Sequence, residues 1–205
     1  MSADFANSKL SRMVGGALLL ATLLGAAWWW SIRIDHPVNP SGTSGITPKA
    51  QAPQLPGDKR LAAWAQQLQM HLAKQPDDVA SWRLLAQTQA TRGDMAQSAA
   101  AWQRALALAP QHADSHAGLA QALAALQQGR LSGEPARWIE SGLQVAADHP
   151  ALLALAGELA GEQGRIDQAQ LHFGRLLQVE QARGADAARL QAIRVRMTEV
   201  AASKP

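Results

Sequence analysis

The sequence has 205 residues, of which 47% are hydrophobic and 4% aromatic, and its formal net charge is +3. Because cysteine is absent, disulfide bonds, thiol nucleophiles and cysteine-based metal sites are excluded. No basic cluster alternates with aromatic residues, so the composition does not indicate a nucleic-acid-binding protein. Alanine, leucine and glutamine dominate and tyrosine is absent, which favours helices over sheets.

The N-terminal part of the chain is predicted to cross a membrane. Residues 13–32 carry no charge, and about 20 apolar residues span a hydrocarbon core of roughly 30 Å. Lys9 and Arg12 precede this segment, and a tryptophan triplet at 28–30 ends it, where indole rings favour the headgroup region. The positive-inside rule then predicts residues 1–12 in the cytoplasm and the rest of the chain on the exported side.

A cleaved signal peptide is the alternative for this segment. Gly25, Ala26 and Ala27 provide small residues at a plausible cleavage site. The length of the segment and its tryptophans favour an uncleaved anchor. Under both interpretations the remainder of the chain is exported.

Residues 33–57 are predicted to form an extended linker. They contain half of the ten prolines, with glycine and serine between them, and neither a helical nor a strand period is present. This linker would separate the folded domain from the membrane.

From residue 58 onward the sequence is helical in pattern and repeats. Pro76 and Pro110 each end an amphipathic run and lie 34 residues apart. Other positions recur at spacings of 34 or 37 residues or at two-repeat spacing, and they hold large hydrophobic residues, small residues and turn glycines: Leu68, Trp102, Ile139 and Phe173; Ala86, Ala120 and Gly157; Gly93 and Gly164. This period and these residue types are typical of tetratricopeptide repeats.

The predicted fold is therefore all-α, with an N-terminal transmembrane helix followed by a tetratricopeptide helical solenoid. Small residues let the two helices of a hairpin approach, and Trp102 and Phe173 are expected between successive hairpins. The predicted segments are an N-terminal capping helix, three repeats, and a C-terminal capping helix with a tail: 58–78; 79–112, 113–149 and 150–183; and 184–205. The extra residues of the second repeat are placed in the turn at 129–135. Gln89 and His116 depart from the usual tyrosine and tryptophan of the repeat.

No pattern in the sequence indicates an enzyme, a cofactor or a metal site. His112 and His116 are four residues apart, but the repeat places them across the start of a helix and gives His116 a core position. Asp77 and Asp78 are interpreted as helix N-caps. Tryptophans 64, 82, 102 and 138 have the spacing of core residues. Neither a phosphate-binding loop nor a nucleophile elbow is present.

A peptide-binding groove is expected along the first helix of each hairpin. The repeat register assigns to it a mildly apolar floor with a few polar residues: Arg83, Gln87, Ala90, Asp114, Ala117, Gln121, Ala124, Ala154 and Glu158. Such a floor suits an amphipathic helix as ligand. Ala117 and Ala154 are expected to face solvent in the free protein, so that a tryptophan there would block the ligand without harming the fold.

Residues 129–179 contain two further stretches, GRLSGEPAR at 129–137 and HPALLALAG at 149–157. With the repeats around them, they resemble the membrane-anchored tetratricopeptide subunit of bacterial cytochrome c maturation over about residues 60–180. The resemblance implies a periplasmic domain that binds the C-terminal helix of apocytochrome c. It also implies that haem lyase membrane subunits, as partners, carry out haem attachment. The single span is similar to the shorter members that serve nitrite reductase maturation.

Two functions follow from the sequence. One is a periplasmic apocytochrome chaperone held in the inner membrane by a single span. The alternative is a general envelope scaffold for another periplasmic protein complex, which the same repeats and anchor would serve.

The predicted topology can be tested by extraction and by a reporter. Because residues 13–32 are long and uncharged, the chain should stay in membranes after a carbonate wash. A reporter fused after Pro205 should be active only on the exported side. Release of a shortened soluble form would instead identify a cleaved signal peptide.

Overall fold

The computed structural model describes residues 57–202 and shows helices and turns throughout that range. The helices are α2 (Gly57–Lys74), α3 (Val79–Thr91), α4 (Met95–Leu108), α5 (Ala113–Leu126), α6 (Glu134–Val145), α7 (Pro150–Glu162), α8 (Ile166–Ala182) and α9 (Ala187–Ala202). The predicted membrane segment and most of the predicted linker lie outside the described residues. Within the described range, no helix is long and apolar enough to cross a membrane.

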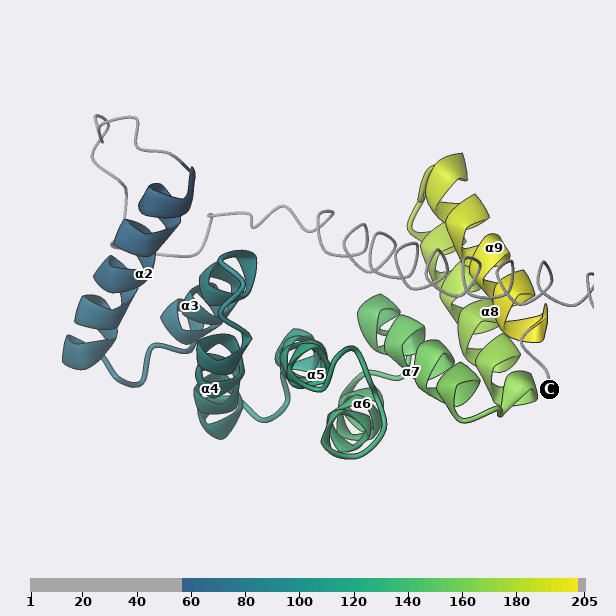
Figure 1. The fold of residues 1–205 in the computed structure, drawn as a ribbon, viewed down its shortest axis with the longest axis horizontal. Helices are drawn as coiled ribbons and strands as arrows, with labels where there is room; N and C mark the ends of the chain where they lie inside the picture. Colours follow the sequence, from purple (N-terminus) through teal and green to yellow (C-terminus); the bar gives the residue numbers. More distant parts are fainter. Residues whose placement is uncertain (1–56, 203–205) are drawn as a thin grey trace, which may run out of the picture. The chain divides into compact units, whose positions relative to one another are not determined.

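The helices form consecutive hairpins in chain order (Figure 1). The pairs α3 with α4, α5 with α6, and α7 with α8 each pack together, and the first helix of each hairpin also packs against the hairpin before it. Helix α2 packs on α3 at one end and α9 packs on α8 at the other. The described part of the chain is thus all-helical, as the sequence predicts.

Glycines and acidic residues set the turns between consecutive helices. Gly93 and Gly164 have φ of +84° and +69°, a conformation that glycine adopts without the Cβ clash that other residues suffer. The side chains of Asp78 and Asp94 accept hydrogen bonds from backbone N–H groups at the starts of α3 and α4. Asp77, which was expected to share the capping role, is exposed.

The longer turn between α5 and α6 is anchored to the third hairpin. Gly129 and Gly133 have positive φ, a conformation that glycine adopts without a Cβ clash. The Leu131 side chain is buried, and its backbone N–H donates to Glu162 Oε2 at the end of α7, at 2.8 Å. The backbone N–H of Ser132 donates to the other carboxylate oxygen of Glu162. The extra residues of the second repeat therefore connect two hairpins.

Large side chains lie against glycines where helices meet. A Cβ added at Gly118 of α5 would lie 2.3 Å from Cε2 of Trp102, which is buried in α4. A Cβ at Gly157 of α7 would lie 2.7 Å from Cζ of Phe173 in α8. Trp102 thus packs between successive hairpins, as predicted. Phe173 packs against Gly157 in the other helix of its own hairpin.

The two departures from the repeat pattern are accommodated in the core. Gln89 is 1% exposed, and its amide donates to Gln97 Oε1 at 2.7 Å and accepts from Arg92 Nη1. His116 is 5% exposed, its Nε2 lies 2.9 Å from the Pro110 carbonyl oxygen, and its ring is tilted against Trp138. Buried polar groups need such partners to offset their desolvation.

Replacing Trp102 by alanine should lower the free energy of unfolding by about 3–5 kcal/mol, because a buried large side chain is lost. Denaturant unfolding measures this, with the exposed neighbour Gln103→Ala as the control. Gly118→Ala alone should destabilise the protein, because the new Cβ clashes with the indole of Trp102. The same substitution should be tolerated in a protein that already carries Trp102→Ala, where the indole is absent. A cost near zero for Trp102→Ala would contradict this packing.

Candidate functional site

The predicted groove residues all lie on the first helices of the hairpins, α3, α5 and α7, but the structure divides them into two groups. The polar members are partly exposed: Arg83, Gln87, Asp114, Gln121 and Glu158. The alanines are buried, at 5% for Ala90, 3% for Ala117, 0% for Ala124 and 3% for Ala154. We call the five polar residues, with His112 and His149, the first-helix face.

The predicted apolar floor is therefore wrong. Ala117 and Ala124 belong to one apolar cluster with Leu152 and Leu155 of α7, so their methyl groups are covered by the next first helix. The small side chains allow α5 and α7 to approach closely, and that contact removes them from the surface. A tryptophan at Ala117 or Ala154 would overpack the core, so the expectation that it leaves the fold intact is also wrong.

A cluster of ionisable side chains connects the starts of the three first helices. Asp114, in the first turn of α5, accepts a 2.8 Å hydrogen bond at Oδ1 from His149 Nε2, just before α7. Its Oδ2 lies 3.8 Å from Arg83 Nη2 on α3 and 3.9 Å from His112 Nε2. Asp114 thus lies between a residue of the preceding hairpin and one of the following hairpin.

Local chain geometry positions the two histidines. His112 is the N-cap of α5, and its Nδ1 accepts from the Ser115 backbone N–H at 3.3 Å. His149 occupies the N-cap position of α7, before Pro150, and makes no side-chain cap. Its ring reaches back to Asp114 instead.

His112 and His116 do not form a pair, since one caps α5 and the other lies in the core. Among the described residues, no group of three potential ligands could hold a metal ion.

The electrostatics of the cluster follow from these contacts. The hydrogen bond from His149 lowers the pKa of Asp114 to about 2, although partial burial opposes this shift. Burial lowers the pKa of His112, and the nearby positive charge of Arg83 adds to that effect. At neutral pH the cluster therefore contains a carboxylate, a guanidinium and an uncharged His112.

Two members of the cluster have unused hydrogen-bonding capacity. Arg83 Nε and His149 Nδ1 are both buried and have no hydrogen-bond partner within the described part of the chain. Of the two side chains, Arg83 is the more exposed. The 3.8 Å separation between Nη2 and Asp114 Oδ2 is too long for a hydrogen bond. The side chain is 32% exposed, so a ligand can reach the guanidinium from solvent.

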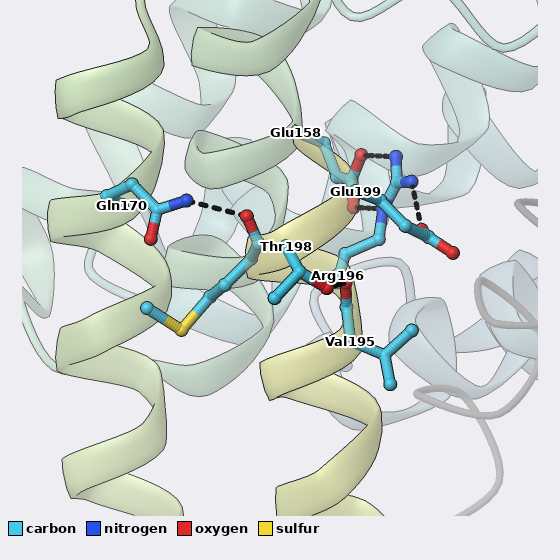
Figure 2. Close-up of polar contacts among 7 residues, drawn as sticks. Glu158, Gln170, Val195, Arg196, Thr198 and Glu199 are labelled. Atoms are coloured by element: carbon cyan, nitrogen blue, oxygen red, sulfur yellow. Dashed lines mark hydrogen bonds and ion pairs between the residues drawn. The ribbon is translucent and has the colours of Figure 1, made fainter. Parts of the chain in front are cut away.

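Glu158 differs from the other polar residues because another helix already binds it. Arg196 of α9 approaches it with two guanidinium nitrogens, and the Nε to Oε1 distance is 2.6 Å (Figure 2). Arg196 Nη1 also donates to Glu199 Oε2 at 2.8 Å. The fork with Glu158 raises the pKa of Arg196 above its ordinary value.

Sequence reasoning missed two residues of this region. Sequence reasoning assigns no role to His149, although its position before Pro150 at a helix start is a usable signal. Arg196 lies in the helix that was interpreted as an end cap, and no local pattern in the sequence connects it to Glu158.

Acid should weaken the domain through Asp114. Its pKa in the folded state is about 2, below the ordinary 3.8, so its stabilising contribution is present above about pH 4 and is lost as the pH falls toward 2. Because the side chain is 46% exposed, solvent screening reduces this contribution to about 1 kcal/mol. Denaturant unfolding of Asp114→Asn between pH 5 and 2 should show a flatter pH profile than the parent. The exposed Asp167→Asn should keep the parent profile, and an unchanged slope in Asp114→Asn would contradict the assignment.

Comparisons with known proteins agree with this fold. No protein-family model matches the sequence, and no curated protein matches it. Two crystal structures of MamA, a tetratricopeptide-repeat protein, are similar to the chain. The match to the first has a TM-score of 0.55 at 12% identity and spans 70% of this chain and 78% of that MamA chain. The match to the second has a TM-score of 0.52 at 10% identity and spans 69% of this chain and 87% of that MamA chain. At these identities the likeness concerns the fold alone: the helical part of this chain has a tetratricopeptide-type fold.

Proposed function

We propose that the domain is a protein-interaction scaffold and that a polypeptide binds to its first-helix face at the first two hairpins. The observation that carries this proposal is Arg83. Its side chain is 32% exposed, and its Nη2 lies 3.8 Å from Asp114 Oδ2, which is too far for a hydrogen bond, so the guanidinium has donors left for a ligand. A carbonyl or carboxylate oxygen of a bound polypeptide would accept from them.

The ligand contacts at this face are mainly polar. Gln87 lies one turn after Arg83 on α3, and Gln121 lies two turns after Asp114 on α5; both side chains are partly exposed. An amide side chain donates and accepts hydrogen bonds, so the two glutamines can fix the position of a peptide segment. Because the alanines are buried, the face offers little apolar area to the apolar stripe of a ligand helix.

The specific ligand that we propose is the C-terminal helix of an apocytochrome c. The support for this is the resemblance of residues 129–179 to the tetratricopeptide subunit of cytochrome c maturation. In this proposal residues 13–32 anchor the chain in the bacterial inner membrane, and the domain acts in the periplasm. The domain binds the unfolded cytochrome and presents it to haem lyase membrane subunits, and it has no catalytic residue or cofactor of its own.

A general envelope scaffold is the second candidate function. The likeness to MamA supports a tetratricopeptide scaffold in general and gives no support to apocytochrome binding in particular. The two candidates differ in ligand selectivity. An apocytochrome chaperone should bind the unfolded apocytochrome in preference to the haem-loaded protein, because the holoprotein packs its C-terminal helix into its own core.

Arg83→Ala should weaken binding of a C-terminal apocytochrome peptide about 10-fold, or roughly 1.4 kcal/mol, because a charge-assisted hydrogen bond is lost. Isothermal titration calorimetry with the full chain in detergent measures this. Arg104→Ala is the matched control, since it removes an exposed arginine from α4, outside the first-helix face. Equal affinities for the parent and Arg83→Ala would exclude this face, and absence of any binding would reject the apocytochrome as ligand.

A further inference from the structure

Helix α9 takes the place in the stack where a fourth hairpin would begin. It packs on α8 as α5 packs on α4, and its Arg196 and Val200 side chains reach α7, the first helix of the preceding hairpin. Gln170 Nε2 of α8 donates to the Met197 carbonyl oxygen at 2.6 Å, and Arg196 binds Glu158 of α7 (Figure 2). One residue of the predicted ligand-binding set is therefore already bound by the chain's own C-terminal helix.

Two residues of α9 account for its contact with α7. Arg196 and Val200 lie four positions apart, on one face of the helix. Val200 covers Gly161, where an added Cβ would lie 3.2 Å from Val200 Cγ1. The carboxylate of Glu158 and the bare backbone of Gly161, three positions apart on α7, thus select a basic residue followed four positions later by a branched aliphatic residue.

Helix α9 is bound less deeply than the helices before it. Of its sixteen residues, Ile193 and Val200 are buried, whereas α7 buries nine of thirteen. Val195 is 44% exposed. The turn that leads into α9 contains Gly184 with φ of +76°, and most of residues 183–186 are exposed. Shallow burial at the end of a repeat stack lowers the free energy of local opening.

We propose that α9 is an intramolecular occupant of the third hairpin, and that a ligand helix with a basic residue and a branched aliphatic residue at i and i+4 displaces it from Glu158 and Gly161. This inference rests on the proposed polypeptide-binding function and adds to it both a sequence preference and an internal competitor. A ligand of this kind makes contacts of the same type as α9. After the exchange, Glu158 and the Gly161 surface are therefore covered again. A simple opening of α9 would leave both uncovered.

The geometry allows α9 to be locked in place with a disulfide bond. The chain has no cysteine, and a Cβ at Gly161 would lie 3.9 Å from Val200 Cβ, close to the mean of about 3.8 Å for disulfides. The double variant Gly161→Cys/Val200→Cys can therefore be compared in its oxidised and reduced forms in the full chain. The probes are a C-terminal apocytochrome peptide with the i, i+4 pattern and a synthetic peptide of residues 187–202.

The oxidised variant should bind both peptides at least 10-fold more weakly than its reduced form and than the parent chain. In the opposite direction, Arg196→Ala should bind them several-fold more tightly than the parent, because α9 is held less firmly. Arg175→Ala is the matched control. Arg175 also forms a two-nitrogen ion pair, with Asp148 outside α9, so this variant should bind like the parent.

The outcomes separate the two proposals. Equal binding of the apocytochrome peptide by the oxidised, reduced and parent forms would overturn the role of α9 and leave the proposed function standing. If the peptide of residues 187–202 binds in a redox-dependent way and the apocytochrome peptide binds to no form, the competitor role stands and the apocytochrome function fails. If the 187–202 peptide binds to no form, α9 is a permanent part of the fold and the inference is wrong.

Discussion

The close approach of helices at glycine and alanine is the constraint on which the rest of this domain depends. Trp102 lies against Gly118, Phe173 against Gly157, and a Cβ at Gly142 would lie 2.7 Å from Leu152. Protein interiors are close-packed, so a large side chain on one helix requires a small one on its neighbour. These pairs set the distance between neighbouring helices. That distance determines which side chains of the first helices remain accessible to solvent.

The same constraint gives the first-helix face its chemistry. The predicted groove alanines of α5 and α7 are buried, so polar side chains form the accessible part of the face. Asp114 links neighbouring hairpins through its contacts with His149 and Arg83, and its carboxylate partly balances the charge of Arg83. Buried and half-buried ionic groups add little net stability, but they fix which groups lie opposite one another. The alignment of the three hairpins at their first helices thus depends on this cluster as well as on apolar packing.

The third hairpin differs from the first two because a helix of the chain itself covers it. Glu158 and Gly161 are occupied by α9, whereas the Arg83 side chain keeps an unpaired Nε. The two ends of the face therefore have different properties: hydrogen-bonding capacity is free at the first hairpin and satisfied internally at the third.

The sequence alone predicts the helical fold, because the 34-residue spacing of large, small and turn residues records which positions face a neighbouring helix. It predicts Trp102 as core, Gly93 and Gly164 as turn positions, and five of the seven residues of the first-helix face. It could not determine whether Ala117 is exposed, because alanine occurs both on surfaces and in close helix contacts. Only the distance between α5 and α7 decides that question. Nor could it join Glu158 to Arg196 or His149 to Asp114, since these pairs are 38 and 35 residues apart and come together only when the hairpins stack.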